Sequence, residues 1–557
     1  MSHKWPWRGV SWGLTAIALA PVAAGLAGVF GPALLGGDGF AAPVRELAAE
    51  PGIWRSAMLS LFTGLLSAAI SVLLTGLILA AAFGGRALNL AERLLAPLLA
   101  VPHAAAALGL AVLVAPSGLV LRALSPWATG LEWPPNVALV NDPWGLALVA
   151  GLVVKEVPFL FLMALAALPR LRPAERVAVA RSLGYGRMRA FTHAVWPLLY
   201  RQIRLPVLAV LAFAASVVDV ALVLGPTQPT TLGVRVLELS QSADIGRWAV
   251  GSAAALLMCA VVLVAIGLWL VLEKVVAAVA GRARVGGRRA ARDAVQRWGV
   301  LAFAGVAVLA LGLGFAGLML QSVAGFWRFP DFWPATFSGA AWARAFGGGV
   351  APLWHTVALA LGATAIVVPA GIAMMTAATR GVRPPPVLYL PLLVPQVAFL
   401  FGLNVLAIGA GLTPGMGTVM LAHAVFVLPY VLIALSGPWM ALDPRYASLA
   451  ATLGASPWRR FWAVRLPLMA PTIAVAVALG IAVSAGLYLP TQLIGAGRVP
   501  TITTEAVTAA VGGDRRAAGV YAVLQLIVPL VAFALARWLP AVVFRGRAGM
   551  VPARLSA

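Results

Sequence analysis

The sequence has few charged residues for its length. Charged side chains make up 10% of the 557 residues, whereas hydrophobic side chains make up 62%. Soluble domains are usually about 25% charged, because their surfaces must be hydrated. This composition excludes a soluble protein, and the mean hydropathy of +0.96 points the same way. We therefore expect a chain that crosses a membrane many times.

Lysine and cysteine are also scarce. The three lysines are Lys4, Lys155 and Lys274, and none follows a glycine, so the chain has no G-x-x-x-x-G-K-[ST] phosphate loop with which to bind ATP. The single cysteine, Cys259, and five scattered histidines give no reason to expect a disulfide or a metal site. No nucleophile, base and orienting residue stand together either. We expect no catalytic residues, no metal and no cofactor on this chain.

The sequence contains many long apolar segments. A membrane-spanning helix needs about 20 mostly apolar residues. We therefore predict an all-α polytopic membrane protein of about twelve spans, six in each half. The predicted spans lie near residues 11–35, 54–83, 94–115, 143–169, 205–225 and 246–272, and near 299–321, 351–379, 387–411, 417–441, 470–495 and 517–541.

Basic residues outnumber acidic ones, 40 to 17, which gives a formal net charge of +23. With the N-terminus placed inside, most Lys and Arg fall in cytoplasmic segments, as the positive-inside rule requires. The basic side then faces anionic lipid and a cytoplasmic partner, so no nucleic acid is needed to explain the charge. Both termini are expected to be cytoplasmic.

A short pattern occurs twice. Gly184 is followed after 13 residues by Pro197, and the same pair returns 270 residues later as Gly454 and Pro467. The local sequence predicts a helix, a turn at the glycine in the left-handed conformation, and a short exposed helix. Ser456 caps the second short helix and Gly186 replaces that cap in the first. We expect a repeat of residues 1–272 (loop 170–204) and 299–541 (loop 442–470), a basic cytoplasmic linker at 273–298 and a tail at 542–557.

The pattern resembles the cytoplasmic EAA loop of permease subunits in bacterial ATP-binding cassette importers of type I. The consensus Glu falls on Ala178 and Ser448. Only the second Ala of the motif is kept, as Ala180 and Ala450. The stretch "VVDVALVLGPTQP" looks most like fused permeases of an uncharacterised branch related to thiamine and ferric-iron permeases. The resemblance implies that the short helix couples to an ATPase through Ala180, Gly184, Arg187, Arg189, Phe191 and Pro197 in one loop, and Ala450, Gly454, Ser456, Arg459, Arg460 and Pro467 in the other.

The same resemblance implies the partners and the location. An ATPase dimer would bind ATP and magnesium on the cytoplasmic side of the bacterial inner membrane. A periplasmic or lipid-anchored protein would deliver the solute on the other side. The Trp- and Pro-rich segment 116–143 is then either a lid on the membrane surface or a docking surface for that protein.

Polar side chains inside the predicted spans are candidates for the translocation path. Pro102-His103 in the first half matches Pro395-Gln396 in the second, and Lys155-Glu156 is an adjacent pair in the fourth span. His103 is either a packed histidine or a ligand, and Asp219 has either a structural or a transport role. The complete set of candidates is His103, Glu156, Asp219, Gln396 and Tyr488.

Two functions fit these features. The chain is either the permease subunit of an ATP-driven importer or a carrier of six plus six helices driven by an ion gradient through Glu156, Asp219 and Lys155. The repeated loop favours the first, because a gradient-driven carrier needs no ATPase docking helices. A membrane-embedded enzyme is the third alternative, and the missing catalytic set argues against it. The acids in the spans hint at a cationic solute such as thiamine or a metal.

Overall fold

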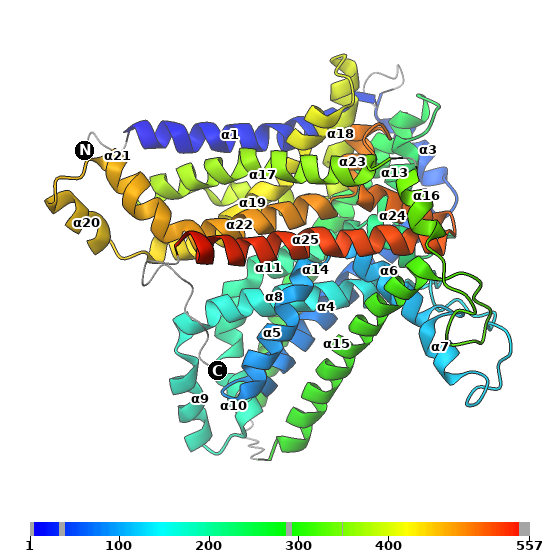
Figure 1. The fold of residues 1–557 in the computed structure, drawn as a ribbon, viewed down its shortest axis with the longest axis horizontal. Coiled ribbons are helices and arrows are strands. Elements are labelled where there is room, and N and C mark those ends of the chain that lie inside the picture. The colour runs from blue at the N-terminus through cyan, green and yellow to red at the C-terminus, as the bar shows by residue number, and fades with distance from the viewer. Residues whose placement is uncertain (1–4, 33–38, 286–291, 348, 545–557) are drawn as a thin grey trace.

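The fold is helical throughout the residues that the computed structural model describes, 5–32, 39–285, 292–347 and 349–544, apart from one isolated bridge between Ala324 and Phe337. Within these ranges eleven helices are long and apolar enough to cross a membrane. The number is twelve if η3 (Pro386–Leu392) and α18 (Gln396–Gly409), which are bent by 92° to each other, form one span. The predicted all-α fold of about twelve spans is confirmed (Figure 1).

The first part of the chain, up to Val285, contains long helices and short ones between them. The long helices are α1 (Trp5–Gly28), α4 (Ile53–Ala82), α5 (Arg86–Ala100), α6 (His103–Val114), α8 (Leu146–Ala167), α11 (Trp196–Ser216) and α14 (Arg247–Val285). The short ones are α3 (Ala41–Ala49), α7 (Leu119–Leu124), η2 (Leu168–Leu171), α9 (Pro173–Ser182), α10 (Arg187–Ala194), α12 (Asp219–Leu224) and α13 (Leu232–Ser240).

The second part follows nearly the same order. Its long helices, besides η3 and α18, are α15 (Ala294–Val323), α17 (Ala351–Ala378), α19 (Met416–Ala441), α22 (Leu466–Gly486) and α25 (Arg515–Val543). The short ones are α16 (Ala340–Gly347), α20 (Arg445–Thr452), α21 (Pro457–Arg460), η4 (Phe461–Arg465), α23 (Leu489–Gly495) and α24 (Ile502–Val511). From α15 to α25 the elements thus correspond to those from α1 to α14.

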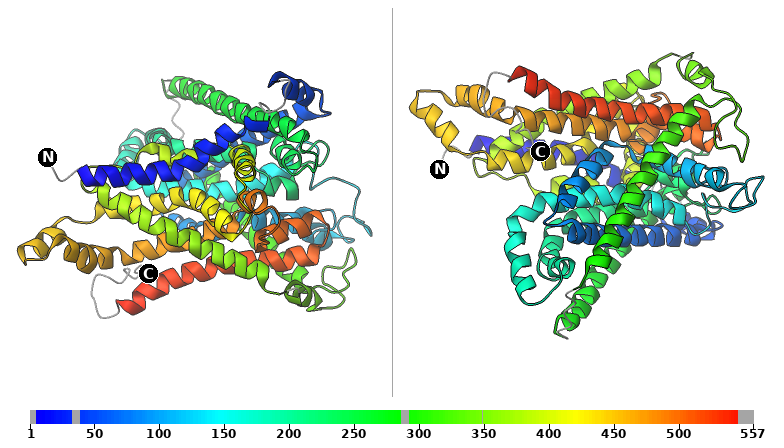
Figure 2. Two further views of the ribbon diagram at one scale, coloured as in Figure 1. Left: turned by 90° about the horizontal axis from the view of Figure 1, so that it is seen from above. Right: turned by 60° about the horizontal axis from the view of Figure 1, so that its bottom comes forward.

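The first helix of each part packs against the other part. Helix α1 lies along α17, α18 and α19, whereas α15 lies against α4 and α6 as well as α25. Figure 2 shows α15, in green, crossing the helices of the first part. The two parts are therefore joined by an exchange of helices as well as by the chain between α14 and α15.

Glycines allow this exchange. A Cβ built on Gly25 or Gly28 of α1 would collide with the carbonyl groups of Phe399 or Gly402 on α18. In the same way, Gly314 of α15 lies against the backbone of Gly109 on α6. Small residues of this kind let helix backbones approach closely in membranes. The two crossings are therefore built from the same residue type at corresponding helices.

Four helices break inside the bundle. Helix α5 ends before Pro102, and η3 ends before Pro395; in each case the proline precedes the first residue of the next helix. Helices α11 and α22 end at Ser216 and Gly486, and each is followed by two non-helical residues and a short helix. Proline cannot donate the backbone hydrogen bond that would continue a helix, which explains the first two breaks. Non-helical backbone at this depth is tolerated where protein or a cavity covers it.

These breaks correct the predicted span limits. Segments 94–115, 205–225, 387–411 and 470–495 are not continuous helices, since breaks fall at 101–102, 217–218, 393–395 and 487–488. Pro197 lies in the first turn of α11, where a missing N–H has no cost, so it begins the following span rather than ends the preceding run. Pro467 lies inside a helix that runs without a break from α21 through η4 into α22, so it does not end a run either. The predicted linker 273–298 is also largely helical in its described residues, while 286–291 and most of the tail, 545–557, lie outside them.

Candidate functional site

A cavity of about 180 Å³ lies where the four helix breaks meet. Its wall includes residues from every break, among them Val101, Val217, Val394 and Leu487. It is therefore shared between the first and second parts of the chain. Non-helical segments at mid-membrane are typical of substrate and ion sites in transport proteins, because they expose backbone groups that a regular helix hides.

All five path candidates predicted from the sequence line this cavity. His103 and Glu156 come from α6 and α8, Asp219 from the start of α12, Gln396 from the start of α18, and Tyr488 from the break before α23. Positions up to 385 residues apart in the sequence are thus brought together around one space.

Lys155 is held by backbone carbonyl groups. Its ammonium donates to the carbonyl oxygens of Leu98 at 3.0 Å, Leu99 at 3.3 Å and Val101. The carbonyls at the C-terminal end of a helix have no partner within the helix. Lys155, only 5% exposed, therefore caps the broken end of α5 and uses all three of its donors there.

Glu156 faces a different neighbour, as adjacent residues on a helix must. Its Oε1 lies 3.4 Å from Nε2 of His103, and the histidine ring packs on Phe213 with ring centroids 4.7 Å apart. The side chain of Glu156 is 5% exposed and that of His103 34%. His103 is thus packed against an aromatic ring and also exposed in the cavity. The two predicted alternatives, a packed histidine and a ligand, are therefore compatible.

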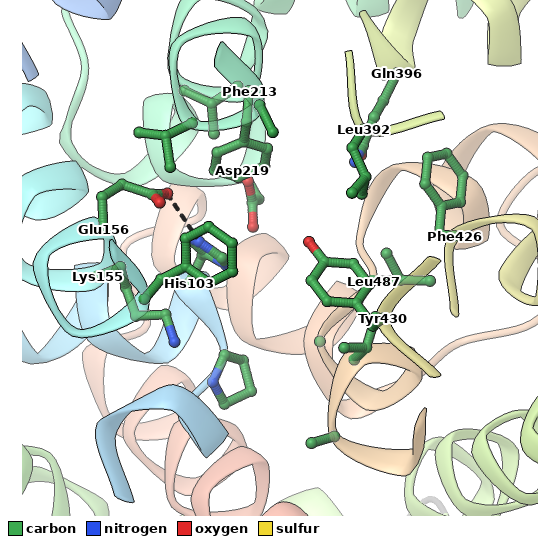
Figure 3. A pocket seen from close by; sticks show the side chains of 18 of the residues that line it. His103, Lys155, Glu156, Phe213, Asp219, Leu392, Gln396, Phe426, Tyr430 and Leu487 are labelled. Carbon is green, nitrogen blue, oxygen red and sulfur yellow. Dashed lines mark hydrogen bonds and ion pairs between the residues drawn. The ribbon is translucent and has the colours of Figure 1, made fainter. Parts of the chain in front are cut away.

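Asp219 points into the cavity from the first residue of α12 (Figure 3). It is 9% exposed, and no other side chain among the described residues donates a hydrogen bond to its carboxylate. Across the space, the hydroxyl of Tyr430 on α19 points toward it (Figure 3). A carboxylate left in this way is costly unless water or a ligand covers it.

The two parts contribute unequally to this wall. Counting from the equivalent prolines Pro158 and Pro429, Lys155 corresponds to Phe426; counting from the ends of α11 and α22, Asp219 corresponds to Leu489. Both apolar counterparts also line the cavity. Its Lys, His, Glu and Asp side chains therefore come from the first part, and the second part contributes mostly apolar and aromatic side chains.

Sequence reasoning missed Tyr430, Phe213 and Phe426. The only signal for Tyr430 was that it directly follows Pro429 in the predicted span 417–441. Nothing in the sequence distinguished the two phenylalanines from other apolar residues. His423, which lies in the same helix as Tyr430, is instead fully bonded, to Ser484 at 2.8 Å and Thr491 at 2.9 Å. In the described part of the chain, no three His, Cys, Asp or Glu side chains lie close enough together to hold a metal ion.

The first repeated loop is folded against the bundle. Gly184 has φ of +91°, which confirms the left-handed turn, and α10 follows with Gly186 as its N-cap. Phe191 is fully buried and packs on Phe83 with ring centroids 5.1 Å apart. Phe191 was predicted to couple to an ATPase, but its side chain is not available to a partner, because it fills the space beneath α10 together with Val195. Ala180 is buried as well, whereas Arg189 and Pro197 are partly exposed.

Arg187 also binds the body of the protein. Its guanidinium donates to the carbonyl oxygen of Phe83, at 2.9 Å from Nε and 2.5 Å from Nη2. Burial and then the nearby charge of Arg297 lower the pKa of Arg187, while Asp293 acts in the opposite direction. Arginine stays charged in proteins, so this side chain is a permanent tie between α10 and the end of α4.

The second repeated loop extends away from the bundle. Gly454 has φ of +78°, and the hydroxyl of Ser456 accepts from the N–H of Arg459 at 3.3 Å, so both the predicted turn and the predicted cap are confirmed. Neither α20 nor α21 contains a buried residue. The large exposed side chains of this loop are Tyr446 (52%), Leu449 (62%), Leu453 (79%), Trp458 (72%) and Trp462 (49%). Arg459 is exposed too, and Ala450, Arg460 and Pro467 are partly buried.

Both loops lie toward the same end of the molecule. In Figure 1, α20 and α21 are at the left and α9 and α10 at the lower left, whereas α7 and α16 are at the right. At that opposite end, Arg122 of α7 donates to the carbonyl oxygens of Arg328 and Asp331, both at 2.7 Å, and so joins the two parts.

Comparison with known proteins gives one family match and matches to three permease proteins. Residues 384–547 match the family described as binding-protein-dependent transport system inner membrane component. The chain is 29% identical over 535 residues to the inner membrane ABC transporter permease protein YnjC of Escherichia coli, which covers 95% of this chain and 96% of the relative.

Shorter matches reach two further permeases. The molybdenum transport system permease protein ModB of Mycobacterium bovis is 34% identical over 115 residues, which is 18% of this chain and 44% of the relative. A homologue of the spermidine/putrescine transport system permease protein PotC from Mycoplasma genitalium is 35% identical over 91 residues, 16% of this chain and 32% of the relative.

Proposed function

We propose that this chain, which belongs to the ABC transporter permease family, is the membrane subunit of an ATP-driven importer and forms the path for a small solute. A single chain would supply both halves of the pore, in a fused form of two permease units. The order of helices from α1 to α14 and again from α15 to α25 supports this fused arrangement, as does a cavity to which both parts contribute.

The observation that carries the proposal is the pair of loops α9–α10 and α20–α21. Each has a helix, a left-handed glycine and a short helix followed by a span, and both lie toward one end of the molecule (Figure 1). An ATPase dimer has two equivalent grooves, so one chain with two such loops can occupy both. The exposed Leu449, Leu453 and Trp458 are apolar side chains of the kind that anchor protein interfaces.

Energy must then come from the partner, because the sequence contains no phosphate loop. Closure of the ATPase dimer on ATP would draw the two loops together. Helix α21 continues through η4 into α22, and α10 is separated from α11 by a single residue, so movement of a loop is passed to a long span. Rocking of the two parts would open the cavity alternately to either side of the membrane.

The opposite end would receive a solute-binding protein. There the exposed side chains of Trp127 (77%), Trp133 (64%) and Trp333 (63%) lie on the segments that Arg122 ties together. Exposed tryptophans favour either the membrane surface or a protein interface. In this arrangement both termini and the loops with glycines 184 and 454 are cytoplasmic, in a bacterial inner membrane.

The solute of this importer is small, given the cavity volume of about 180 Å³. Resemblance to thiamine and ferric-iron permeases suggests a cation. The two short relatives are named for molybdenum and for polyamine transport, which differ in charge, so their names alone favour neither sign.

The decisive experiment replaces both loop glycines. In the double variant Gly184→Val and Gly454→Val, a β-branched residue must adopt positive φ at each turn, at roughly 1–2 kcal/mol apiece. We expect the chain to insert normally but solute-stimulated ATPase activity of the complex to be lost. Gly411 has φ of +67° and open space around it, so Gly411→Val imposes the same strain away from the loops and should leave that activity intact.

Unchanged stimulation in the double variant would refute the coupling scheme. The alternative, a carrier driven by an ion gradient, is tested by sealing the purified chain alone in vesicles. Accumulation of solute against its gradient without any ATPase would establish that alternative, and the importer proposal predicts none.

A further inference from the structure

One carboxylate of the central cavity, that of Asp219, has no side-chain hydrogen-bond partner among the described residues. The ammonium of Lys155 is directed at three carbonyl oxygens of the α5 end and has no donor left for a solute. Glu156 lies against His103, whereas Asp219 has no other side chain donating to it among the described residues. A buried carboxylate therefore faces the cavity without a hydrogen bond or ion pair to a Lys or Arg side chain among the described residues. The groups that stabilise it are the ring of His103 and the backbone N–H groups at the start of α12.

The surface around this carboxylate is aromatic. Phe213, Phe426 and Tyr430 line the cavity, and Figure 3 places them around the space into which Asp219 points. The faces of aromatic rings attract cations, and this attraction grows when water is excluded. A cavity wall of aromatic side chains with one carboxylate suits an organic cation better than a hydrated metal ion, because a metal ion requires several oxygen ligands.

We propose that this cavity is a binding site for a small organic cation, and that Asp219 is its counter-ion. The role of the site in transport rests on the proposed function, whereas binding itself does not. A cleft that holds a drug-sized ligand usually has about 300–1,000 Å³, so a cavity of about 180 Å³ fits a smaller molecule, such as an amine with one ring. An anion would be repelled by Asp219 and could not use Lys155.

The preference for a cation follows from the free energy of the unliganded site. A carboxylate that is buried without a partner is destabilising, and a matching cation removes that cost when it binds. Selectivity follows from the same cost, because a neutral molecule of equal shape leaves the carboxylate uncovered. The site therefore discriminates by charge before it discriminates by shape.

The test uses three probes that share one ring: benzylammonium, benzamide and benzoate. Thermal unfolding of the purified full chain in detergent is followed with each probe, since a ligand that binds only the folded state raises the melting temperature. We expect benzylammonium to raise it and benzamide and benzoate to have no comparable effect. In Asp219→Asn the benzylammonium shift should vanish, which corresponds to a loss of affinity of at least about tenfold.

Two further variants make the test independent of folding defects. Glu92 is an exposed acid on α5, so Glu92→Gln should keep the full benzylammonium shift. Leu489 is the counterpart of Asp219 in the second part of the chain and also lines the cavity. The double variant Asp219→Asn and Leu489→Asp should therefore restore the benzylammonium shift, because it places a carboxylate on the opposite side of the cavity. This restoration is not expected if Asp219 has only a structural role.

Absence of a shift with benzylammonium, an equal shift with benzoate or benzamide, or an undiminished shift in Asp219→Asn would each overturn the inference. The assay contains neither ATPase nor binding protein. If it fails while the glycine double variant still abolishes solute-stimulated ATPase activity, the importer function stands and only the cation site falls.

Discussion

The carboxylate of Asp293 accepts a hydrogen bond of 2.6 Å from the backbone N–H of Met188, although the two residues are 105 positions apart. Asp293 immediately precedes α15, and Met188 is in the first turn of α10. It also accepts from the N–H of Arg189 at 3.3 Å. The residue that begins the second part of the chain therefore satisfies the free amides of a helix in the first loop, in the way that an N-cap residue does.

Replacement of Asp293 should loosen α10. Loss of a cap typically costs about 1 kcal/mol, and a negative charge at a helix N-terminus adds to it. In Asp293→Ala we expect faster hydrogen exchange of the α10 amides and weaker stimulation of the proposed ATPase partner, with normal membrane insertion. Asparagine also caps helices, so Asp293→Asn should retain most of the protection; equal loss in both variants would contradict the capping role.

Trp458 should contribute to partner affinity without contributing to stability. It is 72% exposed on α21 and lies 5.4 Å from Trp462, ring centre to ring centre. Aromatic residues at the centre of an interface typically contribute 2 kcal/mol or more, so Trp458→Ala should weaken ATPase binding by roughly 30-fold at an unchanged melting temperature. Trp333→Ala, at the opposite end of the molecule, is the control and should bind the ATPase normally. Equal binding of the ATPase by both variants would show that α21 is not part of the interface.

The crossing of α1 and α18 depends on Gly402. Its Cβ position is filled by the backbone of α1 at Gly25, so Gly402→Val should force the helices apart and destabilise the fold by about 1–3 kcal/mol or more. Gly409, in the last turn of the same helix, has open space around it, and Gly409→Val should change stability far less. Unfolding of the two variants in mixed micelles measures the difference. Similar stability would show that the crossing adapts to larger residues.

Lys155 should contribute more to the stability of the fold than to the preference of the cavity for a charged solute. Lys155→Met leaves the carbonyl groups at the end of α5 without their donor, which should cost about 2–4 kcal/mol in unfolding free energy. Lys274 is exposed on α14, so Lys274→Met serves as the neutral control. The folded fraction of Lys155→Met should still be stabilised by benzylammonium. Full stability together with a reversed preference for benzoate would mean that Lys155 faces the solute instead.

Much of this architecture could be read from the chain because it depends on local composition. Each predicted span corresponds to a helix or a broken pair, and the left-handed glycines and the Ser456 cap were predicted from residues within a few positions of each other. The five polar path candidates also meet around one cavity, because a polar side chain at mid-span must face the protein interior.

Other features depend on contacts between distant segments and could not be predicted in this way. The burial of Phe191 depends on Phe83, on a different helix, and the capping of α10 depends on Asp293. The helix break at 217–218 contains no proline, so nothing local marks it. The glycines of the crossings did carry a signal, since Gly25 and Gly28 recur at the same spacing as Gly314 and Gly317, but only the structure shows what they touch.

The contact between Gly25 and Gly402 has a consequence for biosynthesis. The two residues are 377 positions apart in the sequence. At a synthesis rate of roughly 5–20 residues per second, α1 must wait about 20–75 s in the membrane before α18 emerges. During that interval its glycine face has only lipid or a chaperone against it. Nascent chains stalled before α18 should therefore be more vulnerable to membrane proteases than the finished chain, because the glycine face of α1 is covered only after α18 has been made.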